Sequence, residues 1–268
     1  MSPYKSSLAP TGIKFPNGLA LSTAGAGTLF VAEGDGASVS VVQVLTSAGV
    51  TVSTWTNYNG TNFGEPYGVA VNQATSNVYV LDNLNNAVYE FTSAGVTVNT
   101  WGGFNAPEGI AFNQANTNVY VADTGNNQVK EFDQNGSPLN QWTTGVTAFS
   151  SPSAVAVDSS GTTLYVADAG NELIQIYNGS SWSSFPTIPG SDIFGITVDG
   201  SGHIYAADAA NGLVEVYDQI GNVLSKWNGV PGGLFNSPDG VVLSGSDVFV
   251  SDFDNGASGT GSVEAFGP

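Results

Sequence analysis

The chain of 268 residues repeats one short phrase six times, and this internal repetition restricts its fold more than any other feature. The phrase is a proline-x-glycine step followed by alternating apolar residues, and it is clearest at Pro66–Val71 and Pro107–Phe112. Its glycine position recurs at steps of 50, 41, 45, 41 and 45 residues. Ala154 replaces the glycine in the fourth copy, and Ile193 replaces the proline in the fifth. A period of this length is typical of supersecondary units that stack side by side.

Each unit contains four short segments of strand type, rich in β-branched and aromatic residues and bounded by Gly, Asn, Asp or Ser. The second segment ends in an acid, as in Tyr120–Asp123, and the fourth contains a tryptophan. The tryptophans are Trp55, Trp101, Trp142, Trp182 and Trp227. Four of them lie ten or eleven residues before the next proline position, and Trp101 is the exception at six. Four strands in each of six units predict an all-β chain, a six-bladed β-propeller of four-stranded antiparallel blades that forms one domain over residues 1–268.

The repeated consensus also resembles the NHL repeat family, most clearly over Ala106–Phe132, and the likeness extends over almost the whole chain. The first unit departs most, because Glu33-Gly34-Asp35-Gly36 replaces the Asp-x-x-Asn step. The resemblance implies a six-bladed propeller whose ligands bind on the face that carries the fourth-to-first and second-to-third strand connections. Some NHL-like lyases hold zinc with several histidines, whereas this chain has one histidine, His203, in a turn expected on the other face.

The last unit ends after its third strand, at Val263–Phe266, and lacks an outer strand of its own. Tyr4 lies twelve residues before Pro16, near the spacing of the tryptophans. We therefore expect residues 2–9 to supply the outer strand of the sixth blade. This pairing closes the ring and removes an exposed sheet edge.

The charge balance excludes several classes of partner. The chain has four lysines, no arginine and 22 acids, which gives a net charge of −18. Nucleic-acid binding needs basic residues to neutralise phosphates, and an anionic membrane repels such a surface. No apolar run reaches the length of a membrane span, so we expect no membrane insertion. Neutral sugars, peptides, cations and neutral protein surfaces are the favoured ligands.

A ring of acids ends the second strand of each unit, and we expect it to be structural. An aspartate followed three residues later by asparagine can accept backbone N–H groups and fix a tight loop. The ring consists of Glu33, Asp82, Asp123, Asp168, Asp208 and Asp252. The alternative is a Ca²⁺ site, because carboxylate and carbonyl oxygens suit this ion. The weak metal candidates are Asp252, Asp254, Glu33 and Asp35.

A second ring, formed by the residue before each glycine of the phrase, differs in every unit. It consists of Asn17, Tyr67, Glu108, Ser153, Phe194 and Asp239. We predict that this ring forms a central mouth where a protein, peptide or carbohydrate binds. Three blades separate Glu108 from Asp239, and three separate Tyr67 from Phe194, so each pair is expected to face across the axis. The opposed acids are expected to lie too far apart to share one ion or to act as a glycosidase pair.

The leading functional hypothesis is a secreted or cell-surface, non-enzymatic propeller that serves as a binding or scaffold module, including self-association in an extracellular assembly. The sequence has no complete catalytic set, so no catalytic residue and no required cofactor are predicted. The alternative is a divalent-cation-dependent hydrolase or lyase that acts at the central mouth, with Glu108 and Asp239 as its acids, bases or ligands. The N-terminal residues have no apolar run, so export requires a signal peptide outside this sequence.

Overall fold

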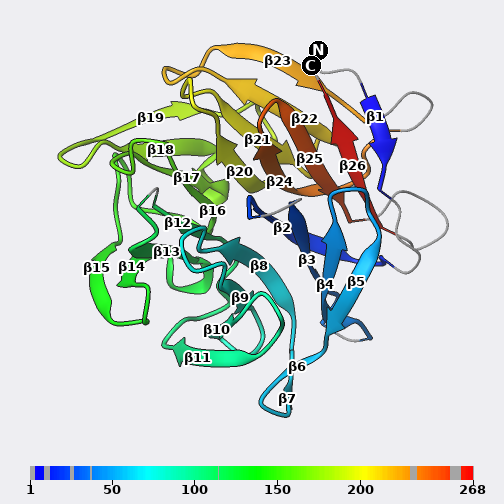
Figure 1. The fold of residues 1–268 in the computed structure, drawn as a ribbon. Helices are drawn as coiled ribbons and strands as arrows, with labels where there is room; N and C mark the ends of the chain where they lie inside the picture. Colours follow the sequence, from blue (N-terminus) through cyan, green and yellow to red (C-terminus); the bar gives the residue numbers. More distant parts are fainter. Residues whose placement is uncertain are drawn as a thin grey trace.

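Six four-stranded antiparallel sheets surround a central axis as the blades of a propeller (Figure 1). The computed structural model describes residues 4–8, 13–24, 27–36, 38–113, 115–229, 234–253 and 261–267. The first strands of the six blades, β2, β8, β12, β16, β20 and β24, contact one another in a closed cycle around the axis. The all-β fold and the number of blades predicted from the repeats are confirmed.

The first three blades follow one another along the chain, each from its inner to its outer strand. Blade 1 consists of β2 (Pro16–Ser22), β3 (Thr28–Gly34), β4 (Ser40–Thr46) and β5 (Thr51–Trp55). Blade 2 consists of β8 (Pro66–Val71), β9 (Val78–Asp82), β10 (Ala87–Phe91) and β11 (Thr97–Gly102). Blade 3 consists of β12 (Ile110–Phe112), β13 (Asn118–Asp123), β14 (Gln128–Asp133) and β15 (Pro138–Trp142). A small hairpin of β6 (Asn57–Tyr58) and β7 (Thr61–Asn62) lies between blades 1 and 2.

The last three blades repeat the same order up to the end of the chain. Blade 4 consists of β16 (Pro152–Val157), β17 (Leu164–Asp168), β18 (Leu173–Tyr177) and β19 (Trp182–Pro186). Blade 5 consists of β20 (Ile193–Val198), β21 (Ile204–Asp208), β22 (Leu213–Tyr217) and β23 (Val223–Trp227). Blade 6 begins with β24 (Pro238–Ser244), β25 (Asp247–Asp252) and β26 (Ser262–Phe266). In the described residues the helices are the single 3₁₀ turns η1 (Thr124–Asn126) and η2 (Ala169–Asn171), and no helix is long and apolar enough to span a membrane.

The N-terminal strand β1 (Tyr4–Ser7) is the outer strand of blade 6, as the missing fourth strand predicts. It runs antiparallel to β26, with Tyr4 opposite Phe266, and the two strands lie side by side in Figure 1. The Leu8 N–H extends the pairing with a hydrogen bond of 2.7 Å to the Val263 carbonyl. Residues 2, 3 and 9 of the expected range lie outside the described residues, and the strand joins the two ends of the ring as expected.

The apolar core lies between the blades, not at the axis. Each of the six buried clusters combines residues from two neighbouring blades, including the cluster that joins blade 6 to blade 1. Strands alternate their side chains between the two faces of a sheet, and both faces of each blade are covered by a neighbour. This explains why the second strands are buried along most of their length.

In blades 1 to 5 an aromatic residue on the outer strand packs against the third strand of the next blade. Trp55 packs on Phe91 at 5.0 Å between ring centres, and Trp227 packs on Phe266 at 5.8 Å. In blade 4, however, Phe185 occupies this position and packs on Tyr217 at 5.3 Å. Each of these aromatic residues pairs with a β-branched residue near the start of the third strand of its own blade. The five residues are Trp55, Trp101, Trp142, Phe185 and Trp227.

All five tryptophans lie on fourth strands as predicted, but their spacing in the sequence does not follow their register there. Trp101 is in the regular register, opposite Val88, whereas Trp182 lies three residues earlier than Phe185 and is opposite Tyr177. The separation from a tryptophan to the next repeat measures the length of the connecting loop. It does not measure the register of the outer strand, which the hydrogen bonds to the third strand determine.

Candidate functional site

A buried carboxylate at the end of each second strand fixes the loop that leads into the first strand of the same blade. Asp82 accepts the backbone N–H groups of Gly64 and Glu65 at 2.8 and 2.9 Å, and Asp168 accepts that of Ser150 at 2.7 Å. In blades 2 to 5 the side chain of the asparagine three residues later also donates to the acid, namely Asn85, Asn126, Asn171 and Asn211. The structural role expected for this ring is confirmed. The loops that it holds all lie at the end of the blades where the first strands begin.

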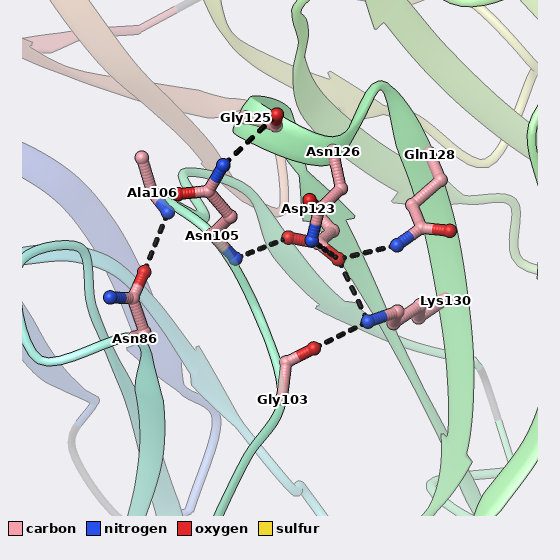
Figure 2. A network of polar contacts seen from close by, with 9 residues as sticks. All are labelled: Asn86, Gly103, Asn105, Ala106, Asp123, Gly125, Asn126, Gln128 and Lys130. Atoms are coloured by element: carbon pink, nitrogen blue, oxygen red, sulfur yellow. Dashed lines mark hydrogen bonds and ion pairs between the residues drawn. The ribbon is translucent and has the colours of Figure 1, made fainter.

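Asp123 of blade 3 adds an ion pair to contacts of this kind (Figure 2). One carboxylate oxygen accepts the Asn105 N–H at 2.7 Å, and the other accepts the Gln128 side-chain amide at 2.7 Å. The Lys130 ammonium lies 2.8 Å from the same carboxylate and donates to the Gly103 carbonyl at 2.6 Å. Because Asp123 is fully buried, this ion pair is shielded from solvent on the acid's side.

Glu33 takes the place of aspartate in blade 1 and is also fully buried. It accepts the Lys14 backbone N–H at 2.9 Å, whereas its Oε1 atom has no hydrogen-bond partner. Burial raises the pKa of Glu33 to about 7, against the lowering effect of its hydrogen bonds. This carboxyl group therefore changes its charge near neutral pH.

The other weak metal candidates use their oxygens within the protein. Asp252 accepts the Ser237 N–H at 2.8 Å, and Asp35 accepts the Val39 N–H at 2.9 Å. Asp254 lies outside the described residues. Across the part of the chain that the structure describes, no three His, Asp or Glu side chains form a group that could hold a metal ion.

The central mouth forms because the glycine present in five of the six repeats lets the next blade approach. A methyl group on Gly68 would lie 2.6 Å from the Glu108 carbonyl oxygen, and one on Gly109 would lie 2.7 Å from that of Ser153. Side chains do not tolerate such contacts, so the glycines permit the close packing of the inner strands. A cavity of about 70 Å³ on the axis is lined by Asn17, Tyr67, Glu108, Phe194 and Asp239. Five of the six residues predicted for the mouth therefore meet in one cavity.

Two residues of the central mouth connect neighbouring blades. Asn17 donates its side-chain amide to the carbonyl of Gly34 at 3.0 Å and to that of Pro66 at 3.3 Å. The Ser153 hydroxyl donates to the Ile193 carbonyl. Both side chains are only 2% exposed, so their polar groups serve the scaffold.

The other four residues face one another across the axis as two crossed pairs. The rings of Tyr67 and Phe194 come within 6.2 Å, centre to centre. The opposed acids also interact electrostatically: after burial and other nearby acids, the Glu108 carboxylate contributes to the raised pKa of Asp239. The mouth is thus narrow enough for one small group to contact both aromatic rings.

The carboxyl groups of the mouth hold their protons unusually strongly. Burial, and then the nearby carboxylates of Asp192 and Glu65, raise the pKa of Glu108 to about 8. Burial also raises the pKa of Asp239 well above its ordinary value, and neighbouring acids add to this against the hydrogen bond from Ser237. No lysine lines the cavity. The site therefore concentrates acidic groups, and no described residue of the lining supplies a positive charge to ionise them.

A wider hollow of about 560 Å³ opens beside the mouth over blades 3 to 5. Glu108 and Phe194 line it together with Asp192 and Glu172, so the acidic surface continues away from the axis. Our sequence interpretation missed Asp192 and Glu65. A signal was present, because both residues directly precede the first position of a repeat phrase.

The opposite end of the axis has a different character. A funnel of about 460 Å³ there is lined by apolar and uncharged polar residues such as Leu21, Phe112 and Gln73. His203 lies in the turn between β20 and β21, 2.8 Å from Asp199, as expected for a surface turn away from the mouth.

The fold and its axial site define the chain as a six-bladed β-propeller. Within it, residues 104–132 match the model of the NHL repeat, which covers blade 3 from its entry loop to its third strand. Comparison with curated protein sequences finds no match.

Solved structures with the same fold include two kinds of protein. A virginiamycin B lyase from Staphylococcus aureus aligns with a TM-score of 0.67 and 13% identity over 96% of this chain and 86% of the other. A catalytically inactive variant of that lyase, with one histidine replaced by alanine and quinupristin present, aligns at 0.68 and 15% identity over 98% and 87%. A chain of a nidogen/laminin complex aligns at 0.67 and 16% identity over 82% and 81%. At these identities the likeness concerns the fold alone.

Proposed function

We propose that this chain is a non-enzymatic binding propeller, and that its central mouth holds a positively charged side chain of a protein or peptide partner. The observation that carries the proposal is the crossed arrangement of two aromatic rings and two acids around one narrow cavity. We further propose that the protein acts outside the cell or at its surface. Its scarcity of lysine and arginine supports this last point.

The chemistry of the mouth favours a cation over a neutral ligand. A cation in the mouth lies close to the Tyr67 and Phe194 rings, and the face of an aromatic ring attracts positive charge. It also lowers the cost of ionising Glu108 and Asp239, because burial, and then the neighbouring acids, raise the pKa values of these groups in the free protein. Binding of a cation therefore releases protons from the mouth near neutral pH. The net charge of −18 attracts such a partner from a distance.

The second candidate is the divalent-cation-dependent hydrolase or lyase, and a virginiamycin B lyase is among the proteins that share this fold. Loss of one histidine is described as inactivating that enzyme. Here the one histidine, His203, lies in a turn at the far end of blade 5 and pairs with Asp199. Metal analysis of the purified protein and its melting temperature with Ca²⁺ or a chelator test this candidate. A stoichiometric bound ion supports the enzyme and contradicts a purely cationic-peptide site.

The binding proposal is tested with pentapeptides that differ only in a central Lys, Arg, Gln or Glu. Binding is measured by titration calorimetry at about 150 mM salt. This salt screens long-range electrostatic attraction and leaves short-range contacts in place. We expect the Lys and Arg peptides to bind, and Glu108→Gln and Asp239→Asn each to weaken this binding about tenfold, since each removes a charge-assisted contact. The matched control is Asp218→Asn, which removes one charge from an exposed turn but keeps its hydrogen-bond acceptor.

Equal binding of the Gln and Lys peptides contradicts the proposal, as does an equal loss of affinity in Asp218→Asn. The assembly hypothesis is a separate proposal, and size-exclusion chromatography with and without Ca²⁺ tests it. A monomer under every condition rejects an assembly and leaves the peptide site untouched.

A further inference from the structure

The seam between blades 3 and 4 differs from its neighbours because a covering turn is too short. In blades 2, 3 and 5, the turn between the third and fourth strands packs its glycine against the outer-strand aromatic of the preceding blade. A methyl group on Gly95 would lie 2.5 Å from the Trp55 ring, and one on Gly136 would lie 2.5 Å from the Trp101 ring. These turns therefore close the outer end of each seam.

The corresponding turn of blade 4 does not reach the preceding blade. Gly95, Gly136 and Gly221 each follow the last aromatic residue of the third strand by four positions, whereas Gly179 follows Tyr177 by two. A methyl group on Gly179 would meet only the Thr162 carbonyl oxygen, at 3.8 Å. The Tyr177 hydroxyl donates to the Gly179 carbonyl at 2.9 Å, so this turn folds back over its own blade.

The short turn leaves an open cleft of about 220 Å³ at this seam, which we call the seam cleft. Its walls include three aromatic rings and three polar side chains, namely Tyr120, Glu131, Asn140, Trp142, Thr162 and Tyr177. Tyr177 is partly exposed, whereas its counterparts Phe91, Tyr217 and Phe266 are each 1% exposed. At about 30 Å³ each, about seven water molecules fill such a space, and one small ring can replace them.

A polar group that is covered in blade 2 is open in blade 3. In blade 2 the Glu90 carboxylate accepts the Tyr79 hydroxyl at 2.8 Å, and that hydroxyl lies 3.1 Å from the Gln134 carbonyl of the covering turn. Blade 3 repeats the first contact, with Tyr120 donating to Glu131 at 2.9 Å. The short turn of blade 4 supplies no counterpart of Gln134.

The cleft therefore combines flat aromatic surfaces with unused hydrogen-bonding capacity. Among the described residues, the donors to Glu131 both reach its Oε1 atom, and Oε2 is left to accept from a ligand. Asn140 and Thr162 add exposed amide and hydroxyl groups at the rim. No basic residue lines the cleft, so an anionic ligand has no counter-charge.

We infer that the seam cleft is a carbohydrate subsite, in which one neutral sugar ring stacks on Trp142 and Tyr177 and its hydroxyls bind Glu131, Asn140 and Thr162. The apolar face of a pyranose ring fits an aromatic face, and its hydroxyls both donate and accept, as this rim requires. The site is distinct from the central mouth and does not depend on it.

Saturation-transfer NMR and tryptophan fluorescence test the inference with methyl glycosides of glucose, galactose, mannose, xylose and N-acetylglucosamine. Concentrations up to about 50 mM detect dissociation constants in the millimolar range. We expect at least one glycoside to bind, and Trp142→Phe and Asn140→Ala each to weaken binding at least about threefold. Asn140 is exposed, so its substitution leaves the fold intact.

The matched control is Trp101→Phe, which alters the equivalent residue of a seam that Gly136 covers. It should leave glycoside binding unchanged. Absence of binding by every glycoside overturns the inference, and so does an equal loss of affinity in Trp101→Phe. Tetramethylammonium chloride is included as a probe, because its binding without any glycoside binding would identify an aromatic cage for cations instead.

Discussion

Replacing Glu108 with glutamine is expected to stabilise the protein at pH 8 and to change its stability little at pH 4. The folded protein raises the pKa of this carboxyl group from 4.5 to about 8. Between these values the folded state binds a proton that the unfolded state has released, so stability falls as the pH rises through this window. Glutamine has nearly the same shape as glutamic acid, but its side chain does not ionise.

The size of the effect follows from the same pKa. At about 1.4 kcal/mol per pKa unit, the rise from 4.5 to about 8 corresponds to at most about 5 kcal/mol. The side chain is partly exposed at the mouth, and solvent screening reduces this value, so we expect a gain of about 2 kcal/mol at pH 8.

Urea denaturation of the parent protein and Glu108→Gln, in steps of half a pH unit from pH 4 to pH 8.5, measures the difference between their free energies of unfolding. Asp218→Asn serves as the control, because hydrogen bonds lower the pKa of this exposed acid and its contribution to stability is lost only on acidification below the usual range. A difference between Glu108→Gln and the parent that stays constant over the whole range would refute the reasoning. So would destabilisation at pH 8.

Three further predictions concern the scaffold. Deleting residues 1–10 removes the outer strand of blade 6 and should lower the melting temperature by about 10 °C or more, measured by circular dichroism. Asp123→Ala should cost about 3 kcal/mol of unfolding free energy, because it leaves the Lys130 charge unpaired at a partly buried site, whereas Asp123→Asn should cost less; equal costs in urea denaturation would show that the charge is unimportant. Gly136→Ala should cost about 2 kcal/mol or more, since it adds a clash with a tryptophan ring to the strain of a positive φ of 84°. Gly179→Ala has a similar φ of 89° and open space, so it should cost only about 1 kcal/mol, and an equal loss in the two variants would contradict the description of the open seam.

Much of the central mouth could be predicted from the sequence because its residues occupy one position in every repeat. A position that repeats in sequence must repeat around the axis, so the repeat spacing alone places Tyr67 and Phe194 opposite each other. Whether their rings touch depends on the width of the ring of inner strands. That width is decided by the packing of glycines against neighbouring carbonyls, which the sequence does not state.

The roles of individual mouth residues could not be predicted in the same way. Asn17 and Ser153 stand at the same repeat position as Glu108, yet they bind backbone carbonyls of the adjacent blade. The raised pKa of Glu108 depends first on its burial and then on Asp192 and Glu65, which are far from it in sequence. Electrostatic interaction depends on separation in space, and only the closed ring brings these acids together.

By itself the sequence determined the six blades, their strands and the closure of the ring by the N-terminal strand. Those features follow from local alternation and from one strand that the last repeat lacks. The tertiary structure alone decided the register of Trp182 and the opening of the seam beside Trp142. A seam is formed by residues of two different repeats, and a turn that is two residues shorter changes which atoms meet there without disturbing the strand pattern of either repeat.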